Sequence, residues 1–461
     1  MKAVDVVIMA AGKGTRMKSR KPKVLHRLAG RALVDHVVDC ATQLGARSTI
    51  LVTGHGAEEV EAAVRQTAPK AVFVRQEPQL GTGHAVQQAV PKLPDDGIAL
   101  ILNGDVPLIR PETLQPLVDA CGGERLALLG VVMPDPTGYG RIVREGERVR
   151  AIVEHKDADQ AQRAIREIYT GFMAAPNALL KRWLARLRND NAQGEYYLTD
   201  VVKHAVADGV EVVAIDCDDR VQVEGVNSPV QLAELERAFQ LRRARELMEQ
   251  GVRLADPARL DVRGTLECGA DVEIDVNCVF EGKVVLGDGA RIGPNCVIAN
   301  ATIAAGAVLE AFCHIDGEKG EVQIGEAAEV GPFARLRPGA KLGPQVHIGN
   351  FVEVKNSSLA RGAKANHLAY LGDAVVGERV NYGAGSITAN YDGAYKHRTV
   401  IEDDVHIGSN CVLVAPVTIG KGGTVGAGST ITKDTAPEVL SVARGKQASI
   451  TGWQRPKKAP K

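Results

Sequence analysis

Residues 324–354 read IGEAAEVGPFARLRPGAKLGPQVHIGNFVEV, and this segment establishes the architecture of the second half of the chain. An aliphatic residue returns at every sixth position, here and again later in the chain. The two series are Ile324, Val330, Leu336, Leu342, Ile348, Val354 and Ile401, Ile407, Leu413, Ile419, Val425, Ile431. A period of six fits neither a helix nor an alternating strand, and it is typical of hexapeptide β-helices. We therefore expect a left-handed parallel β-helix in which these side chains point inward and stack.

Two further features of this half follow from the spacing. The slot two residues before the aliphatic position holds small residues, and cysteine fills it at Cys278, Cys296, Cys313 and Cys411. We interpret these cysteines as small core residues rather than redox or nucleophilic groups. The period breaks between Thr388 and Val400, where the segment 389–396 is rich in Gly and Tyr. A loop that leaves a regular solenoid often carries function.

The first half of the chain has a different pattern, in which short apolar runs alternate with helical stretches. The expected strands are 4–9, 48–52, 71–74, 98–102 and 126–132, and helices are expected at 33–44 and 58–65. This alternation predicts a Rossmann-like α/β domain with a largely parallel sheet, on which ligands gather at the carboxyl ends of the strands. We place that domain at residues 1–227, a linker helix at 228–250 and the β-helix at 251–461. Ser228, Pro229 and Gly251 are suitable cap, first-turn and end residues for the linker helix.

Composition excludes several classes of protein. The 461 residues carry 56 basic and 56 acidic side chains, which argues against a nucleic-acid partner. No apolar run is long enough to insert into a membrane, and the N-terminus lacks a signal-peptide pattern. The eight cysteines form no Cys-x-x-Cys pair, so we expect no disulfide framework and a cytoplasmic location.

A glycine-rich turn follows the first expected strand and points to phosphate chemistry. It reads Met9-Ala10-Ala11-Gly12-Lys13-Gly14-Thr15-Arg16-Met17, and Lys23 follows. Such a turn lets backbone N–H groups approach phosphate oxygens, while Arg16 and Lys23 supply positive charge. Taken alone, a tight turn with solvated basic residues is an equally good interpretation.

Two other segments favour the phosphate interpretation. Gln76 and the turn Gly81-Thr82 form a second glycine-rich connection, and Asn103-Gly104-Asp105 comes directly after an apolar run. A carboxylate at the carboxyl end of a strand suits Mg²⁺ bound to a nucleotide, although a turn aspartate is the alternative for Asp105.

These motifs resemble those of the sugar-nucleotide pyrophosphorylases and occur in the same order. They are Gly-x-Gly-Thr-Arg-Met (12–17), Pro-Lys (22–23), Leu-Gly-Thr-Gly-His (80–84), Gly-Asp-Val-Pro-Leu (104–108), Pro-Thr-Gly-Tyr-Gly-Arg (136–141), Val-Glu-His-Lys-Asp (153–157) and Gly-Glu-Tyr-Tyr-Leu-Thr-Asp (194–200). With a β-helix attached, nearly the whole chain resembles the bacterial bifunctional N-acetylglucosamine-1-phosphate uridylyltransferase / glucosamine-1-phosphate N-acetyltransferases. The resemblance implies synthesis of UDP-N-acetylglucosamine for peptidoglycan and lipopolysaccharide.

For the first site, the resemblance implies attack of N-acetylglucosamine-1-phosphate on the α-phosphorus of UTP, with release of pyrophosphate. It implies that Asp105 and Asn227 hold Mg²⁺ and that Arg16 and Lys23 face the phosphates. The remaining nucleotide and sugar contacts that it implies are Met9, Ala10, Ala11, Gly12, Gln76, Gly81, Thr82, Asn103, Gly104, Gly140, Glu154 and Tyr169. Tyr169 stands where the family usually has Asn, and Asn103 stands where Tyr is common.

For the second site, the resemblance implies acetyl transfer from acetyl-CoA to the amine of glucosamine-1-phosphate, with His367 as the general base. The implied substrate contacts are Arg337, Lys355, Tyr370, Asn381, Asn390 and Tyr391, and the implied acetyl-CoA contacts are Ala384, Ser409, Ala427 and Arg444. It also implies a homotrimer. From the residues alone, His367 is more often structural, and Arg337 and Lys355 more often lie on a solvated face.

Two other functions remain compatible with the pattern. One is a single-activity sugar-nucleotide pyrophosphorylase whose β-helix is not catalytic. The other is a non-catalytic scaffold that binds metabolites. His367 and the segment Asn390-Tyr391 argue against the first, and Lys23, Asp105 and Asn227 argue against the second.

Overall fold

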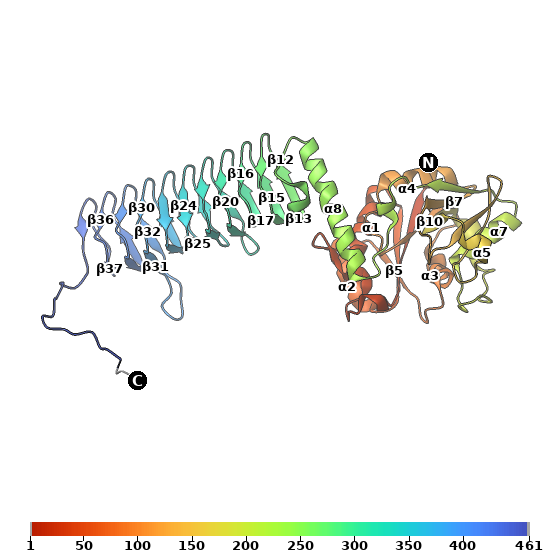
Figure 1. Cartoon of the computed structure of the whole chain (residues 1–461), viewed down its shortest axis with the longest axis horizontal. Helices are drawn as coiled ribbons and strands as arrows, with labels where there is room; N and C mark the ends of the chain where they lie inside the picture. Colours follow the sequence, from red (N-terminus) through yellow and green to blue (C-terminus); the bar gives the residue numbers. More distant parts are fainter. Residues whose placement is uncertain (1, 459–461) are drawn as a thin grey trace. The chain divides into compact units, whose positions relative to one another are not determined.

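A computed structural model describes residues 2–458, and the chain divides into two compact units between Phe239 and Gln240. The first unit is an α/β domain and the second is a stack of short parallel strands (Figure 1). Each unit buries its own apolar core. Within residues 2–458, no helix has the length and apolar character needed to cross a membrane.

The sheet of the first unit has the strand order β11-β7-β10-β6-β1-β4-β5. Its strands are β1 (Val4–Ala10), β4 (Ser48–Thr53), β5 (Val72–Arg75), β6 (Ile98–Asn103), β7 (Leu126–Val132), β10 (Glu167–Pro176) and β11 (Val212–Asp216). Neighbours pair in parallel except β10, which runs antiparallel to both β6 and β7. The sheet is therefore largely parallel, as expected, and becomes mixed because one long antiparallel strand is inserted between two parallel parts. The hairpin of β8 (Arg141–Glu145) and β9 (Arg148–Val153) branches from β10.

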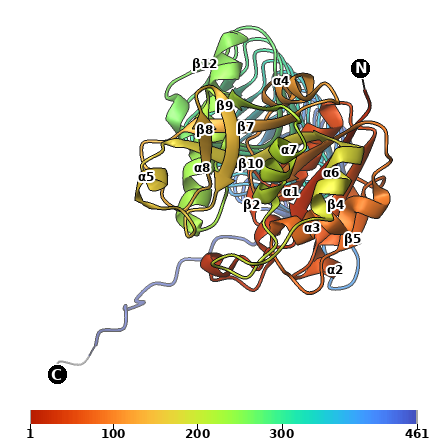
Figure 2. The same ribbon diagram turned by 90° about the vertical axis from the view of Figure 1, so that its right-hand side faces the viewer.

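Helices cover both faces of this sheet (Figure 2). Helices α1 (Leu33–Gln43), α2 (Ala57–Thr67) and α4 (Pro111–Cys121) pack in one core, and α3 (Thr82–Ala89), α6 (Asn177–Leu184) and α7 (Val201–Ala207) pack in the other. Side chains alternate along a strand, so Val6 and Ile8 of β1 enter the first core while Val7 enters the second. Strands buried on both faces explain the continuous apolar runs in the sequence. The short elements are β2 (Arg27–Leu28), β3 (Arg31–Ala32) and α5 (Gln160–Arg163).

Helix α8 (Pro229–Glu249) forms at the position expected for a linker helix, and the boundary between the two units falls within it. The Ser228 Oγ accepts a hydrogen bond from the Gln231 N–H at 3.2 Å, as expected for an N-cap. Phe239 packs edge-on against His36 of the first unit, with ring centroids 5.8 Å apart. Gln240 instead donates to and accepts from the backbone of Val262 in the second unit, at 3.0 and 2.8 Å.

The second unit is a parallel β-helix. One side is an eleven-stranded sheet: β12 (Arg253–Leu254), β14 (Glu273–Ile274), β16 (Arg291–Ile292), β18 (Val308–Leu309), β21 (Glu329–Val330), β24 (His347–Asn350), β27 (Lys364–His367), β30 (Asn381–Tyr382), β33 (His406–Ile407), β36 (Thr424–Val425) and β38 (Leu440–Ser441). The other two sides belong to one sixteen-stranded sheet that β13 (Leu260–Cys268), β15 (Cys278–Leu286) and β17 (Val297–Ile303) join at one end.

Two ladders extend from β17 in that larger sheet. The first is β19 (His314–Asp316), β22 (Arg335–Leu336), β25 (Glu353–Lys355), β28 (Tyr370–Gly372), β31 (Ile387–Ala389), β34 (Val412–Val414) and β37 (Thr430–Ile431). The second is β20 (Val322–Ile324), β23 (Lys341–Leu342), β26 (Ser358–Leu359), β29 (Ala374–Val376), β32 (Thr399–Ile401) and β35 (Val417–Ile419).

The register confirms the period of six. Ile324 pairs with Leu342, and the neighbouring sides pair Val330 with Ile348 and Leu336 with Val354. These side chains are buried and form one continuous core along the coils. The four cysteines in the small slot are also buried in this core, as expected, and burial raises the pKa of the Cys278 thiol to about 12. Thiolate chemistry is therefore disfavoured at Cys278.

The break in the period is a loop that leaves the coils after β31 (Figure 1). Tyr391 and Lys396 form an antiparallel bridge across it. The Asp392 carboxylate accepts hydrogen bonds from the backbone N–H groups of Ala394 and Tyr395, at 2.8 and 2.7 Å, and lies 2.6 Å from His397 Nε2. The Tyr395 N–H and then His397 hold the pKa of Asp392 well below its usual range. The loop is thus held in one shape by its own hydrogen bonds.

Candidate active sites

The glycine turn after β1 packs against Lys23, at the carboxyl ends of β1 and β6. Gly14 has φ +60°, and a Cβ there would lie only 2.6 Å from the Lys23 Cβ. Gly14 is therefore required both by its backbone conformation and by this close approach. Arg16 lies on the 3₁₀ turn Thr15–Met17, exposed, and makes no ion pair within residues 2–458.

Three side chains from distant parts of the sequence converge beside this turn. The Lys23 ammonium forms an ion pair with the Asp105 carboxylate and lies 3.2 Å from the Asn227 amide oxygen. Asp105 follows β6 and Asn227 precedes α8, and the Val226 N–H donates to the Asp105 carbonyl at 2.9 Å. Lys23, Asp105 and Asn227 are mostly shielded from solvent. The arrangement holds a carboxylate and an amide oxygen around one positive charge.

A cavity of about 450 Å³ opens beside these groups. It is lined by Met9, Ala10, Ala11, Gly12, Lys13, Lys23, Val24, Gln76, Gln79, Gly81, Thr82, Ala85, Asn103, Asp105 and Glu195. The structure thus gathers most of the residues that the sequence indicated for nucleotide binding. Gln79 was missed, although it lies between Gln76 and the second glycine turn. Its amide donates to the Ala11 carbonyl at 2.6 Å and so joins the two turns.

The second glycine turn fixes the far wall of the cavity. Gly81 has φ +106°, and a Cβ there would lie 2.7 Å from the Tyr196 carbonyl oxygen. The Gln76 amide donates to the Gly81 carbonyl at 2.8 Å. Thr82 begins α3, and its hydroxyl accepts the Leu198 N–H at 3.1 Å. Any side chain at position 81 would push this turn away from the cavity.

The residues expected on the sugar side also lie together. The Gly140 carbonyl accepts the Tyr169 N–H at 2.9 Å, and a Cβ on Gly140 would lie 3.6 Å from the Glu154 carboxylate. The Thr199 hydroxyl donates to Glu154 at 3.1 Å, and burial raises the pKa of Glu154. The Tyr169 hydroxyl is buried and has no hydrogen-bond partner among the described residues. Burial, followed by the charge of Glu154, raises the pKa of Tyr169.

The remaining expected residues at this site are held by backbone contacts. The Gly104 N–H donates to the Met9 carbonyl at 2.9 Å, which ties the end of β6 to β1. Asn103 ends β6 and lies against Gly171, where a Cβ would collide with the Asn103 amide nitrogen. The glycine at position 171 therefore makes room for Asn103.

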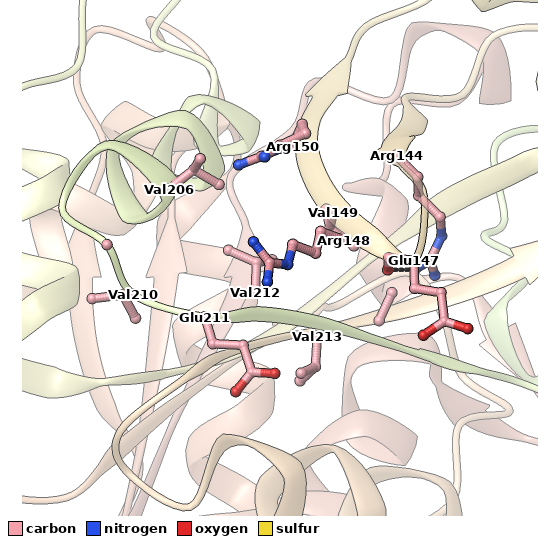
Figure 3. Close-up of a pocket in the computed structure, with 12 residues that line it drawn as sticks. Arg144, Glu147, Arg148, Val149, Arg150, Val206, Val210, Glu211, Val212 and Val213 are labelled. Carbon is pink, nitrogen blue, oxygen red and sulfur yellow. Dashed lines mark hydrogen bonds between the residues drawn. The ribbon is translucent and has the colours of Figure 1, made fainter.

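A second cavity, of about 650 Å³, lies elsewhere in the first unit (Figure 3). Residues 147–150 line one side of it and residues 209–214 line the other. Arg148 and Arg150 point into the gap from β9, and Glu211 lies across from them (Figure 3). None of the site residues that the sequence indicated lines this cavity, so it is separate from the phosphate-handling groups.

In the second unit, three cations gather beside the ladder of β22, β25 and β28. The nearby Lys396 ammonium, then burial, then Arg337 lower the pKa of Lys355. Arg337 donates to the Glu353 carboxylate at 2.8 Å. Lys396 comes from the loop after β31, so the loop completes the cation cluster. Sequence reasoning placed Lys396 on that loop without assigning it a contact.

Two expected substrate contacts border this cation cluster. A Cβ on Gly372 would collide with the Tyr370 hydroxyl and lie 2.8 Å from the Asn390 amide, so both side chains approach the same glycine. The Asn390 amide donates to the Asp373 carboxylate at 2.5 Å. Tyr391 is exposed on the loop, and its hydroxyl donates to the Gly393 carbonyl at 2.6 Å.

His367 ends β27 in the other sheet and is exposed. Its Nδ1 lies 2.8 Å from the Asn350 side-chain oxygen, one coil earlier. Because that oxygen can only accept, Nδ1 carries the proton and the lone pair of Nε2 is left available as a base. Asn381 lies on β30 of the same sheet, so His367 and Asn381 are not on the strands that carry Lys355 and Tyr370.

The residues expected to bind acetyl-CoA stack in one row that begins at His367. They lie at the same position on successive coils. The backbone N–H of the residue after each position donates to the carbonyl of the equivalent position one coil earlier. These bonds run from Gly385 to His367 (3.3 Å), from Asn410 to Ala384 (2.8 Å) and from Gly428 to Ser409 (2.8 Å). The Arg444 guanidinium donates to the carbonyl of Ala427, which is the next position in this row. The four positions therefore form a continuous row that begins beside the backbone of His367.

Comparison with known proteins assigns a family to each of the two units. The MobA-like NTP transferase domain matches residues 6–170, and the bacterial transferase hexapeptide (six repeats) matches residues 267–300 and 398–433. The chain is 73% identical to the bifunctional protein GlmU of Polaromonas naphthalenivorans, over 99% of this chain and 98% of that protein. It is 70% identical to the bifunctional protein GlmU of Paracidovorax citrulli, over the full length of both.

The chain belongs to the GlmU family. This assignment confirms the expected fold, a nucleotidyltransferase domain followed by a hexapeptide β-helix. It also confirms the two-activity function expected from the sequence, in which a nucleotidyltransferase and an acetyltransferase of one GlmU chain together make UDP-N-acetylglucosamine. The single-activity alternative is not favoured, because the family match extends through the β-helix.

Proposed function

We propose that the cavity of about 450 Å³ in the first unit binds UTP and N-acetylglucosamine-1-phosphate and catalyses uridylyl transfer. The observation that supports this most directly is the convergence of Lys23, Asp105 and Asn227 at the mouth of a cavity walled by two glycine turns. The turn 9–14 presents backbone N–H groups to the phosphates, and Lys23 and Arg16 stabilise the charge that develops on them. Catalysis then depends on alignment and charge neutralisation, without a covalent intermediate.

The chemistry of the Lys23 contacts fits a magnesium ion. Asp105 and Asn227 already direct oxygen atoms at one cation, the Lys23 ammonium. Mg²⁺ commonly takes one or two protein oxygens and completes its shell with phosphates and water. We propose that Asp105 and Asn227 hold Mg²⁺ when UTP is bound, where the ion neutralises phosphate charge. Lys23 is then released to the phosphate.

We assign the sugar to a group of residues of which Asn103 lines this cavity and the other three do not. Glu154, with Gly140 close to it, offers a carboxylate acceptor for sugar hydroxyls. The buried Tyr169 hydroxyl and the amide of Asn103 are further polar groups on this side. We assign the sugar to these four residues.

The second unit is the proposed acetyltransferase. His367 removes a proton from the amine of glucosamine-1-phosphate through its free Nε2, and Arg337, Lys355 and Lys396 bind the phosphate. Tyr370, Asn381, Asn390 and Tyr391 surround the sugar. Acetyl-CoA lies along the row of Ala384, Ser409, Ala427 and Arg444, which leads to His367.

A homotrimer would explain why one chain carries these groups on two sheets. His367 and Asn381 lie on one sheet, while Lys355 and Tyr370 lie on the other, so a complete site can combine groups from neighbouring copies. An exposed apolar column supports this proposal. Phe312, Phe333 and Phe351 stack with ring centroids 4.9 and 5.3 Å apart, all at positive φ. Such strained, exposed aromatic residues are suited to a protein interface.

We place the enzyme in the cytoplasm, where thiols stay reduced and both UTP and acetyl-CoA are made. All eight cysteines of the structure are free thiols, which fits that compartment. The product then supplies peptidoglycan and lipopolysaccharide synthesis.

One experiment separates the two activities. The purified protein is mixed with glucosamine-1-phosphate, acetyl-CoA, UTP and Mg²⁺, and each component is omitted in turn. We expect pyrophosphate release to need all four, and free CoA to appear without UTP. Pyrophosphate release from glucosamine-1-phosphate without acetyl-CoA would contradict the proposed order of reactions.

A further inference from the structure

We propose that His84 is a positioning residue for the first site: it holds the side-chain amide of Gln76 in one orientation and so selects the nucleobase. The inference rests on the proposed function, because it requires a nucleotide base beside Gln76. His84 lies in the first turn of α3, directly after the glycine turn that walls the cavity. It does not line the cavity itself.

The orientation of the Gln76 amide follows from its neighbours. Gln76 is only 5% exposed. Its amide nitrogen lies 2.8 Å from the Gly81 carbonyl oxygen and 3.3 Å from His84 Nδ1. A carbonyl oxygen can only accept, so the nitrogen of the amide must face Gly81. The second N–H of the same group then points at His84 Nδ1, which must accept it.

The His84 ring has a second amide neighbour, and the two amides compete for the one ring nitrogen that can accept a hydrogen bond. His84 Nε2 lies 3.2 Å from the amide nitrogen of Gln88, one turn along α3. The Gln88 amide nitrogen already donates to the His84 carbonyl oxygen at 3.0 Å, and because Gln88 is half-buried its other N–H can be solvated. The second N–H of the buried Gln76 amide has only Nδ1 as an acceptor among the described residues, so leaving it unpaired costs more. The proton therefore belongs on Nε2, and Nδ1 stays free to accept from Gln76.

This arrangement leaves one atom of Gln76 for a ligand. Both N–H groups of the amide are engaged inside the protein, and Gln76 lines the cavity. The amide oxygen of Gln76 accepts no hydrogen bond from the described residues, so it is available as an acceptor for a ligand in the cavity. Uracil presents a ring N–H donor where cytosine presents a lone pair. The fixed amide thus favours a uridine nucleotide and disfavours a cytidine nucleotide.

The test compares kcat/KM for UTP and CTP in variants at position 84. His84→Phe keeps a ring to pack against Tyr196 but has no Nδ1 acceptor. We expect it to lower the UTP-to-CTP preference by roughly three- to tenfold, the size of one neutral hydrogen bond. The loss should lie mainly in KM for UTP. His84→Asn returns an acceptor near the Nδ1 position and should restore most of the preference. The matched variant Gln88→Ala should keep the wild-type preference.

A double-mutant cycle shows whether His84 acts through Gln76. In a Gln76→Ala background, His84→Phe should change the UTP-to-CTP preference no further. An unchanged preference in His84→Phe, or an additional loss in the Gln76→Ala background, would overturn the inference. The thermal unfolding transition of the first unit, measured on the same preparations, reports whether each variant is folded. A wild-type protein that releases no pyrophosphate from UTP would instead overturn the proposed function itself.

Discussion

The side chains around Lys23 can serve the first site both without a ligand and with a bound metal ion. An ammonium that pairs with Asp105 stabilises the carboxylate before any ligand arrives. The same carboxylate, with the Asn227 oxygen beside it, can then exchange the ammonium for a metal ion. The ion pair therefore stabilises the site in the absence of a ligand. In the proposed function, the Lys23 ammonium occupies the position that a metal ion takes when UTP binds.

Replacing Asp105 by Ala should lower Mg²⁺-dependent uridylyl transfer by about 100-fold or more, because it removes one of the two side chains that we propose hold Mg²⁺ and leaves the Lys23 charge unpaired. Pyrophosphate release measures this activity. Acetyl transfer by the same preparation should stay at the wild-type rate. Unchanged uridylyl transfer in this variant would remove Asp105 from the metal site.

Replacing His367 by Ala should lower acetyl transfer by roughly 10²- to 10⁴-fold, the range of general-base catalysis. Release of CoA thiol measures this activity, and uridylyl transfer from added N-acetylglucosamine-1-phosphate is the control. Asn350→Ala is a useful second variant, because Asn350 only holds the tautomer of His367 and should cost less. Loss of both activities in a folded His367→Ala protein would contradict two independent sites.

Asp5 makes the stability of the first unit depend on pH. Burial would raise the pKa of Asp5, but hydrogen bonds from Arg47, Asn177 and Ser48 outweigh it and hold the pKa below its ordinary value of 3.8. A depressed pKa stabilises the folded state at pH values above the ordinary pKa, and this stability is lost as the pH falls through the lower pKa of the folded state. Thermal unfolding followed from about pH 5 downward should show this loss, and Asp5→Asn should flatten it. An equally steep pH dependence in Asp5→Asn would exclude Asp5 as the cause.

At the scale of elements, each coil of the β-helix depends on the coils above and below it. Ile324 of β20 stacks between Ile303 of β17 and Leu342 of β23. No coil can bury its own aliphatic side chains alone, so stability is shared along the stack. The loop after β31 is tolerated because the ladders resume in register behind it, where Val376 pairs with Ile401.

Shortening one stacked side chain should therefore destabilise the whole second unit. We expect Ile324→Ala to lower its free energy of unfolding by about 2–5 kcal/mol, through lost burial and a cavity between coils. Chemical denaturation followed by acetyltransferase activity measures the change. Gln323→Ala, at the neighbouring exposed position, should have little effect. Equal effects of the two substitutions would contradict the inward orientation of Ile324.

At the scale of the whole molecule, two separately packed units divide the chain near the middle of α8. We therefore expect calorimetry to resolve two unfolding transitions. Ile324→Ala should lower the midpoint of one, and Asp5→Asn should lower the midpoint of the other. A single transition moved by both substitutions would show that the units unfold together.

The sequence by itself determined the repeating architecture and most of the first sheet. The period of six appears in the chain because each inward side chain meets its counterpart one coil away. The strands β1 and β6 read as apolar runs because both of their faces are buried. Patterns of this kind involve residues that are close together in the sequence, so they can be recognised without a structure.

Only the tertiary structure decided which distant groups meet. Lys23 and Asp105 are 82 residues apart, and Lys23 and Asn227 are 204 apart, so no local pattern could pair them. The antiparallel insertion of β10, the contact of Gln79 with the first glycine turn and the row from His367 to Arg444 are likewise set by folding. Hydrogen bonds and charges act over a few ångströms in space, whatever the distance along the chain.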